Sequence, residues 1–523
     1  MPPRASLKTF LATARAALTA PSSKRTTPLT FVVGNESADL DSLCSALLLA
    51  YFQTYAPPKK RASIGDGNGN SSSSSSSSSS AGTLHIPICH LYRADLALRP
   101  EFAAVLRAAD VRGEDVFTLE DVLPPSRSGR AAGEKASHHH NHQDTEKREG
   151  KGEGEGERDE ISLSLSPEDT RWLLVDHNEM TGRLATSGFA ARVVGCVDHH
   201  ADEGVVPRDA DPRVVERSGS CASLVLERCA EIWEALGASS SSAGIKGGSG
   251  GGKEGKGGGG GGNDEEVENS ARIDAQLARV ALAPILIDTS NLGDESKTTA
   301  HDEGAVALAE AKIAAYEKLK AAGNGSVGKM EVEGKGEGVG ERYDRAALFA
   351  RLSALKDDLD DMSLRDIFRK DYKEWGVGGL NLATSSIPRG FGYLLARKAG
   401  GDAAEMASAV RRWGDEKDGS VAGGEKMDLV VLLTTFVDDA GEFSRELLVC
   451  ARSEKGVRAA EMLEERWRGE LGLESWGGGV LDSGRDGEGG EWCRCWTQRA
   501  VKHSRKQIAP MLRDALKEVA GQG

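Results

Sequence analysis

The chain has 523 residues, which is enough for at least one large buried core, and its length alone favours two to four domains. Its formal net charge of −15 at pH 7 argues against a general binder of nucleic acid or other polyanions. No apolar run approaches the roughly 20 residues needed to cross a bilayer. We therefore expect a soluble protein, a monomer without nucleic-acid or membrane partners.

The N-terminal segment contains no acidic residue among its first 35 positions. Such a segment could be a transit peptide, which would direct the protein to mitochondria or plastids. An apolar face at helical spacing is nevertheless formed by five residues, Leu7, Phe10, Leu11, Ala14 and Leu18. This pattern favours a surface helix of the mature protein, and a cytoplasmic location.

Low-complexity segments interrupt the rest of the chain. Serine fills positions 71–80, an acidic Gly/Glu/Lys/Arg segment spans 147–160, and glycine dominates 247–262. Such compositions cannot bury enough apolar surface to offset ordering entropy, so we predict disordered loops, and the remainder fits two domains. We predict an N-terminal helix or extension over 1–27 and a first domain over 28–320, with inserts at about 57–83, 128–162 and 237–268. A flexible linker over 321–342 then leads to a second domain over 343–520.

The eight cysteines are scattered along the chain. Only Cys493 and Cys495 lie close together, so the spacing predicts neither a disulfide framework nor a zinc site. A reducing compartment is the simpler interpretation.

Four short apolar runs end in Asp or His. The runs are "LTFVV", which leads to Asp39 and Asp41, "RWLLVD", which ends at Asp176, "RVVGCVDHH", which ends at Asp198, His199 and His200, and "LAPILID", which ends at Asp288. The runs alternate with helix-like stretches at 42–53 and 222–235, so we predict the parallel strands of an α/β sheet. Ligand sites form beyond the carboxyl ends of such strands, so these side chains should converge.

Several converging carboxylates repel each other and lose solvation, unless cations bind among them. Oxygen ligands with one or two imidazoles suit Mg²⁺ or Mn²⁺, with Co²⁺ or Zn²⁺ as substitutes. A carboxylate that bridges two ions is typical of two-metal hydrolases. An Asp after a strand can also be a mere helix N-cap, and for Asp288 alone the two interpretations are equally good. The histidine-rich stretch at 138–142 lies in an insert, and we interpret it as a solvated tract.

These motifs resemble the DHH phosphoesterase superfamily. "GNESADLDS", "VDHNE", "VDHH", "GSCASLV" and "ILIDTSN" follow the order of its motifs, and "SLRDIFRKDYKEW" with "HSRKQIAP" resembles the second domain that family II inorganic pyrophosphatases share with eukaryotic exopolyphosphatases. The resemblance is strongest to the cytosolic eukaryotic exopolyphosphatases, whose first motif begins with Gly-Asn. It implies a parallel-sheet DHH catalytic domain, a smaller C-terminal α/β domain that binds phosphate, and an active site in the cleft between them.

The resemblance also implies a role for each matching residue. One metal ion would be held by Asp39 and Asp176, with Asn35 where pyrophosphatases have a histidine ligand. The other ion would be held by Asp41, Asp176, His199 and Asp288. His200 would face the substrate phosphate or support the ligands, Asp198 would orient a neighbour through hydrogen bonds, and Gly219 and Ser220 would shape the turn beside the site, with Ser220 near the substrate.

Three cations of the second domain match residues that grip phosphates in the family: Lys373, Arg505 and Lys506. Arg can bind a phosphate with two hydrogen bonds, and Lys supplies a point charge. Basic residues near a C-terminus are otherwise usually a solvated surface. The overall negative charge does not exclude a phosphate site, because charges act within a Debye length of about 8 Å.

The resulting hypothesis is an exopolyphosphatase that removes terminal orthophosphate from inorganic polyphosphate. A water activated by two Mg²⁺ or Mn²⁺ ions would attack the terminal phosphorus, with Asp176 as the bridging carboxylate and His200 and the three cations at the substrate. The alternatives are a pyrophosphatase or short-chain phosphodiesterase, and a prune-like regulatory protein. The preferred chain length stays open.

Overall fold

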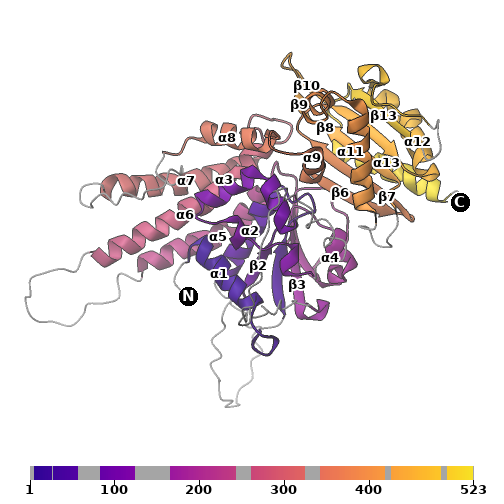
Figure 1. The fold of residues 1–523 in the computed structure, drawn as a ribbon. Coiled ribbons are helices and arrows are strands. Elements are labelled where there is room, and N and C mark those ends of the chain that lie inside the picture. Colours follow the sequence, from indigo (N-terminus) through magenta and orange to yellow (C-terminus); the bar gives the residue numbers. More distant parts are fainter. Residues whose placement is uncertain are drawn as a thin grey trace, which may run out of the picture.

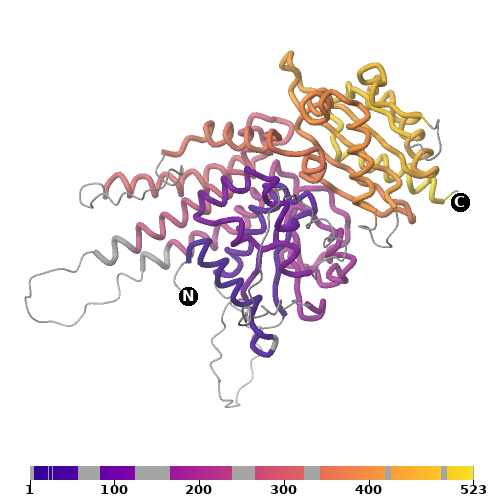
Figure 2. Tube along the Cα trace, viewed as in Figure 1, coloured from indigo at the N-terminus to yellow at the C-terminus, as the bar shows by residue number. Residues whose placement is uncertain are grey.

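The computed structural model describes residues 5–25, 28–56, 83–123, 165–242, 261–323, 342–418, 426–484 and 492–521. In the described residues the chain forms two domains, the first drawn from indigo through magenta to salmon and the second from orange to yellow in Figures 1 and 2. The predicted loops at 71–80 and 147–160 and the histidine tract lie outside the described residues, so their disorder stays a prediction.

The N-terminal helix that the apolar pattern predicts is confirmed as α1 (Leu7–Leu18). Its five apolar residues are all buried in the core of the first domain. The Ser6 side chain caps the helix by accepting a hydrogen bond from the Thr9 backbone. On the opposite side, Arg15 binds Asp121 at 2.7 Å and its guanidinium lies over the ring of Phe117. The helix is therefore an integral part of the domain.

A parallel sheet forms the centre of the first domain. Its strand order is β2-β1-β3-β4-β5, and each neighbouring pair is parallel. The strands are β1 (Leu29–Val33), β2 (His85–Ile88), β3 (Thr170–Val175), β4 (Val193–Asp198) and β5 (Arg213–Val215). Three of the four predicted strands are thereby confirmed, as β1, β3 and β4. Their carboxyl ends lie at one edge of the sheet, as the sequence predicts.

Helices pack on both sides of this sheet (Figure 1). The helices of this domain after α1 are α2 (Leu40–Tyr55), α3 (Pro100–Ala108), α4 (Gly182–Thr186), α5 (Cys221–Ser242), α6 (Gly261–Asp288), α7 (Ala300–Gly323) and α8 (Arg345–Asp357), of which α7 and α8 pack on other helices. Helices α2 and α5 confirm the predicted stretches at 42–53 and 222–235. The core of the domain joins residues of α1, α2, α5, α6 and α7 to the sheet.

The fourth predicted strand is wrong, because the run that ends at Asp288 is the last part of α6. A short apolar run does not distinguish a buried strand from a buried helix, and length has to decide. Here helical residues extend back to Gly261, and alanines at 275, 278, 281 and 283 lie buried against other helices. Asp288 therefore reaches the site from a helix C-terminus. The helices α5 and α6 also continue into the predicted insert at 237–268, and α7 reaches into the predicted linker.

The second domain contains a mixed sheet with the order β12-β13-β11-β8-β7-β6. Only the β7–β8 pair is parallel among the described pairs of this sheet. The strands are β6 (Tyr372–Val377), β7 (Leu380–Ile387), β8 (Leu429–Thr434), β11 (Glu446–Ala451), β12 (Leu473–Ser475) and β13 (Trp492–Gln498), and a small hairpin is formed by β9 (Phe436–Val437) and β10 (Phe443–Ser444). This confirms the predicted smaller α/β domain.

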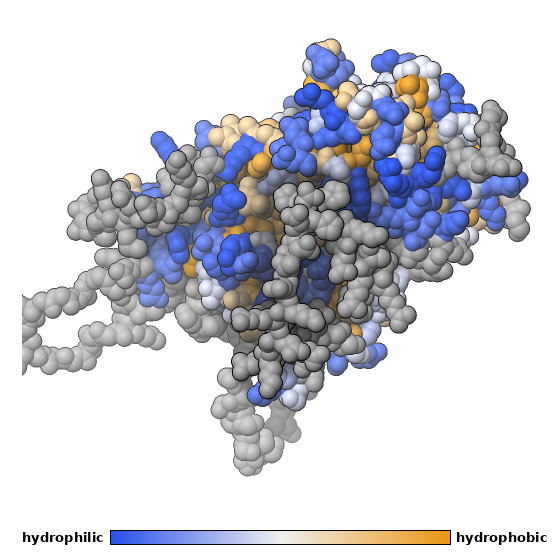
Figure 3. All heavy atoms as spheres, in the orientation of Figure 1, coloured by the Kyte–Doolittle hydropathy of each residue, from blue (hydrophilic) through white to orange (hydrophobic). Residues whose placement is uncertain are grey.

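Two helical layers cover the mixed sheet. One layer consists of α12 (Glu454–Leu471) and α13 (Arg505–Gly521), and the other of α9 (Leu364–Lys370), α10 (Phe391–Tyr393) and α11 (Ala403–Lys417). Successive strand residues face opposite layers, as Val430 and Val431 do. Hydrophilic residues predominate on the face of this domain that Figure 3 shows.

The structure contains a disulfide bond that the cysteine spacing did not predict. Cys450 and Cys493 are paired residues of the antiparallel strands β11 and β13, and they form a disulfide. They are 43 positions apart in the chain. Only the strand register brings them together, so cysteine spacing could not predict the bond.

Polar contacts join the two domains. Arg369 binds Asp95, and the Lys370 ammonium donates to the carbonyl oxygen of Leu98 at 2.9 Å. The Arg505 guanidinium donates to the Ser37 hydroxyl at 2.9 Å. The loop after β1 is therefore tied to the beginning of α13. None of the described helices is long and apolar enough to span a bilayer.

Candidate metal and phosphate site

The loop between β1 and α2 turns the chain sharply. A Cβ atom at Gly34 would lie 2.5 Å from the Ser42 Cβ, so only glycine fits there. The Ser42 hydroxyl accepts a hydrogen bond from the Asn35 backbone at 3.1 Å. Asp39 is the N-cap of α2 and accepts from the Ser42 backbone at 3.0 Å. The N-cap interpretation of this Asp is thus correct, and its second oxygen remains available to the site.

Asp176 lies at the centre of the site, directly after β3, and its side chain is 2% exposed. One carboxylate oxygen accepts from the Asn35 amide and from the Ser42 hydroxyl, each at 2.7 Å. The other oxygen lies 3.2 Å from Nε2 of His199. Burial alone would raise the pKa of Asp176, but the hydrogen bond and the charge of His199 outweigh it and lower the pKa. The carboxylate is therefore ionised and fixed on both sides.

His199 points its Nε2 atom into the same space. Its Nδ1 lies 3.0 Å from the carbonyl oxygen of Ser218, to which it donates. Its Nε2 lies 4.0 Å from an oxygen of Asp41. Burial lowers the pKa of His199, but the hydrogen bond to Asp176 and the charges of Asp176 and Asp41 raise it to about 10. A backbone carbonyl on one ring nitrogen is the usual support of a metal-binding histidine.

His200 is oriented by a carboxylate. Its Nδ1 lies 2.8 Å from an oxygen of Asp198, which also accepts from the backbone of His199 at 2.8 Å and of His200 at 3.2 Å. The other Asp198 oxygen accepts from Asn178 at 2.6 Å. Asp198 is fully buried, so it holds the turn after β4 and orients the imidazole instead of reaching the cavity centre. The family resemblance implies the same orienting role for Asp198.

Asp41 lies against the N-terminus of α5. Its carboxylate accepts from the Ser220 hydroxyl at 2.8 Å and from the backbone nitrogens of Cys221 and Ala222 at 2.6 and 2.9 Å. Burial and the charges of Asp176 and Asp288 raise its pKa. Ser220 is fully buried behind Asp41. The structure thus places Ser220 beside a predicted metal ligand, and its predicted substrate contact would require access that the described arrangement does not provide.

The donor atoms of Asp176, His199 and His200 lie within 4.8 Å of one another. Asp39, Asp41 and Asp288 line the same cavity, which has a volume of about 1030 Å³, but they are not part of this three-residue cluster. The donor set fits divalent cations, since oriented imidazoles and buried carboxylates converge without a guanidinium or ammonium bonded to Asp176. Burial raises the pKa of Asp288 to about 7, although the charge of Lys356 opposes this.

Both polar atoms of the Asn35 amide form hydrogen bonds within the protein instead of being free to bind a metal ion. Its amide nitrogen donates to both the carboxylate and the backbone oxygen of Asp176, and its amide oxygen accepts from the Ala38 backbone at 3.3 Å. In this arrangement Asn35 orients Asp176. Its predicted coordination of a metal would require the amide to turn, and it stays a prediction.

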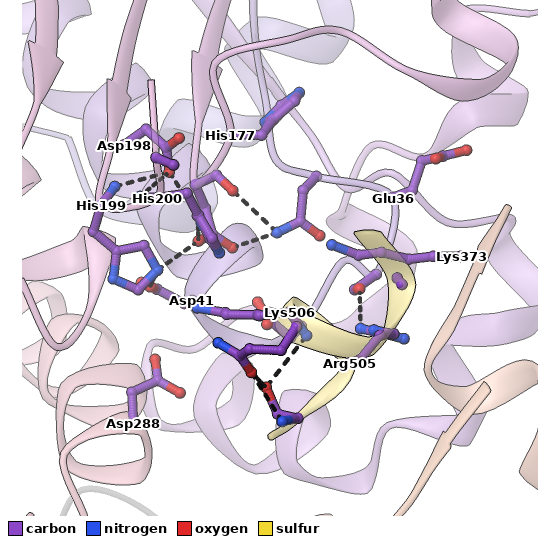
Figure 4. Close-up of a pocket in the computed structure, with 18 of the residues that line it drawn as sticks. Glu36, Asp41, His177, Asp198, His199, His200, Asp288, Lys373, Arg505 and Lys506 are labelled. Atoms are coloured by element: carbon purple, nitrogen blue, oxygen red, sulfur yellow. Dashed lines mark hydrogen bonds and ion pairs between the residues drawn. The ribbon is translucent and has the colours of Figure 1, made fainter. Parts of the chain in front are cut away.

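Three predicted cations line the opposite wall of the cavity (Figure 4). Lys373 comes from β6, and Arg505 and Lys506 begin α13. Arg505 binds Asp371 at 2.8 Å as well as Ser37. Burial and the charge of Arg505 lower the pKa of Lys373. The same cavity is also lined by cations that we did not predict: Arg217, Lys297, Lys356, Arg445, Lys502 and Arg513.

The sequence analysis did not identify the residues that orient the predicted metal ligands through hydrogen bonds. Ser42 and Asn178 lie inside the quoted motifs "GNESADLDS" and "VDHNE", so their polar side chains beside the acids were a usable signal. Asp302, which holds the turn at 218–220, follows Thr299 in a Thr-x-x-Asp spacing that is typical of a helix start.

The chain is similar to several known proteins. A family model described as "DHHA2 domain" matches residues 350–515. A curated protein of Schizosaccharomyces pombe, "Putative exopolyphosphatase", is 26% identical over 492 residues, which cover 94% of this chain and 91% of that protein. A solved structure, "Crystal structure of Methanococcus jannaschii putative family II inorganic pyrophosphatase", is 16% identical, with a TM-score of 0.45, and the match covers 93% of this chain and 99% of that one.

The DHHA2 match coincides with the domain that carries Lys373, Arg505 and Lys506. The Asp-His-His motif after β4 supplies two of the three side chains of the candidate metal cluster. Residues 350–515 therefore form a DHHA2 domain, and the chain as a whole is similar to a relative named "Putative exopolyphosphatase" along nearly its full length.

Proposed function

We propose that this protein is a phosphoesterase of the exopolyphosphatase type, which releases terminal orthophosphate from inorganic polyphosphate with the help of two Mg²⁺ or Mn²⁺ ions. The observation that carries the proposal is a single cavity with two unlike walls. Carboxylates and imidazoles of the first domain face a set of cations of the second domain across it. A long polyanion needs both a site for its reacting end and cations along its length. The relative named "Putative exopolyphosphatase" supports the same substrate class.

Asp176, His199 and His200 would hold the ions together with Asp39, Asp41 and Asp288. Bound divalent ions supply Lewis acidity and an activated water at neutral pH. Asn35 and Ser42 orient the Asp176 carboxylate, so that its other oxygen, next to His199, keeps a fixed direction when phosphate binds.

Lys506 and Lys373 would contact the phosphate oxygens and stabilise the charge that develops on them. Arg505 is already oriented by Asp371 and by Ser37 of the opposite domain. A phosphate that entered here would compete with the Ser37 hydroxyl for the guanidinium. Substrate binding would therefore exchange a neutral contact between the domains for a charge-assisted one.

The test is phosphate release from long-chain polyphosphate, tripolyphosphate, pyrophosphate and a cyclic nucleotide, each with Mg²⁺ or Mn²⁺ and with a chelator as control. We expect kcat/KM to be highest for polyphosphate and activity to disappear with the chelator. A preference for pyrophosphate or the cyclic nucleotide would identify one of the alternative enzymes. Absence of hydrolysis in the presence of bound metal would favour a regulatory protein.

A further inference from the structure

A buried carboxylate outside the cavity holds the turn between β5 and α5. Asp302 lies in the first turn of α7, and its side chain is 0% exposed. Its two oxygens accept six hydrogen bonds, of 2.6–3.2 Å, from the hydroxyls of Ser218, Ser223 and Thr299 and the backbone nitrogens of Gly219, Ser220 and Thr299. Burial would raise the pKa of Asp302, but these bonds outweigh it and lower the pKa. The group is therefore an anion satisfied by donors.

Both ends of this turn contact predicted metal ligands. At one end, the carbonyl oxygen of Ser218 accepts from Nδ1 of His199 at 3.0 Å. At the other end, Ser220 and the first backbone nitrogens of α5 donate to Asp41. The rotation of the His199 ring and the position of the Asp41 carboxylate thus both depend on where the turn lies.

The turn also packs tightly on the end of α6. A Cβ atom at Gly219 would lie 2.5 Å from Cγ2 of Thr289 and 3.0 Å from an oxygen of Asp302. Thr289 directly follows Asp288, a third predicted ligand. Only a glycine allows the backbone of the turn to approach Asp302 and the α6 terminus at once.

A simpler role for Asp302 is to cap its own helix. The Thr299 backbone and hydroxyl, which both donate at 2.8 Å, satisfy that role, because Asp302 lies at the third position after the cap. The other four donors come from residues 218–223, about 80 positions earlier in the chain. A helix cap does not require them.

We propose that Asp302 is a positioning residue, which holds the turn at 218–220 and thereby aims His199 and Asp41 at the bound metal. The proposal rests on the metal-dependent function proposed above. Partners that orient metal ligands are typically worth about tenfold to a hundredfold in metal affinity. Asp302 does not line the cavity, so its effect on phosphate binding should be small.

The test is Mn²⁺ titration by calorimetry on the full chain, without substrate. Asp302→Asn should weaken Mn²⁺ binding by about tenfold or more, and should lower kcat for phosphate release more than it raises KM. Added Mn²⁺ should restore part of kcat. The control is Asp344→Asn, because Asp344 caps α8 through the Ala347 backbone at 2.9 Å. It should change the melting temperature at most, and leave Mn²⁺ affinity unchanged.

Two milder variants separate positioning from capping if Asp302→Asn does not fold. Ser223→Ala removes a donor from the turn side, at 2.6 Å, and Thr299→Val removes one from the capping side, at 2.8 Å. We expect only the first to weaken Mn²⁺ binding, and the second to lower the melting temperature alone. Equal Mn²⁺ affinity in Ser223→Ala and the parent protein would overturn the proposal.

The outcomes also separate this proposal from the proposed function. If the parent protein binds Mn²⁺ but does not cleave polyphosphate, the function is wrong and the affinities still decide the role of Asp302. If the parent protein binds neither Mn²⁺ nor Mg²⁺, both proposals are contradicted.

Discussion

The two walls of the cavity are built in different ways. In the first domain, Asp41, Asp176 and Asp198 are at most 3% exposed, and each accepts three or more hydrogen bonds. In the second domain, the side chain of Lys506 is exposed, and no hydrogen bond or ion pair joins it to another described residue.

This difference suits the two walls to different tasks, metal coordination for the first and phosphate binding for the second. Metal coordination demands fixed ligand geometry, which a buried hydrogen-bond network provides. A phosphate chain offers similar oxygens along its length, so an adaptable cation such as Lys506 can bind it beside Arg505, which Asp371 and Ser37 hold in place. Mutations in the first wall should therefore abolish the chemistry, whereas those in the second should weaken it gradually.

The largest effect is expected for Asp176→Asn. The substitution removes the negative charge at the centre of the site. It also replaces a carboxylate that accepts hydrogen bonds from Asn35 and Ser42 with an amide. Phosphate release should fall by orders of magnitude while the circular dichroism spectrum stays unchanged. Turnover close to that of the parent protein at saturating Mg²⁺ would refute the bridging role.

The next largest effect is expected on metal affinity, when the predicted ligand His199 is removed. His199→Ala should weaken Mn²⁺ binding by at least about tenfold, because it removes an imidazole that the Ser218 carbonyl orients. Calorimetry would measure the affinity. His85, a histidine of β2 that is not among the cavity-lining residues, offers a control as His85→Ala. If both variants bind Mn²⁺ equally well, His199 is not a ligand.

A smaller effect is expected on the phosphate wall. Lys506→Ala should raise KM for polyphosphate about tenfold and lower kcat less, since loss of one charge-assisted contact is worth about 1.4 kcal/mol or somewhat more. Arg505→Ala should act more strongly on kcat, because Arg505 also joins the domains through Ser37. Lys517→Ala, on the same helix and 61% exposed, is the matched control. Identical kinetics in Lys506→Ala and Lys517→Ala would mean that Lys506 belongs to a solvated surface.

The last effect concerns stability instead of activity, in the core behind the metal wall. His90 is buried next to the Gly34 carbonyl, and burial lowers its pKa to about 3. The unfolded chain binds a proton near pH 6.5 and the folded chain does not, so His90 contributes stability above pH 6.5 that is lost as the pH falls toward 3. Between pH 7 and 5 this amounts to about 2 kcal/mol.

Urea unfolding of the metal-free protein at both pH values tests this point. The loss of stability between pH 7 and pH 5 should be smaller in His90→Asn than in the parent protein. An equal loss in both proteins would show that His90 is protonated in the fold.

The sequence could predict those parts of the fold and the site that depend on local pattern. Short apolar runs rich in Val and Leu, each followed by an acid, correctly indicated β1, β3 and β4. The same kind of run before Asp288 was assigned to a strand, because an alanine-rich helix that is buried on all sides loses its amphipathic signal.

The remaining features depend on contacts between distant positions. Asn35 meets Asp176 across 141 positions, and Asp302 meets Gly219 across 83. Residue spacing predicts neither the orientation of the Asn35 amide nor which carboxylate accepts hydrogen bonds from a turn that is distant in the sequence. The Cys450–Cys493 pair likewise follows from strand register alone.

The most direct test of the central claim is a crystal structure of the full chain with Mn²⁺, in which anomalous scattering locates the ions. The account predicts two Mn²⁺ ions in the cavity, both in contact with the Asp176 carboxylate, and His199 bound through Nε2. It also predicts that the cations of the second domain face the ions across the cavity. Ions bound elsewhere, or a single ion that does not contact Asp176, would contradict the account.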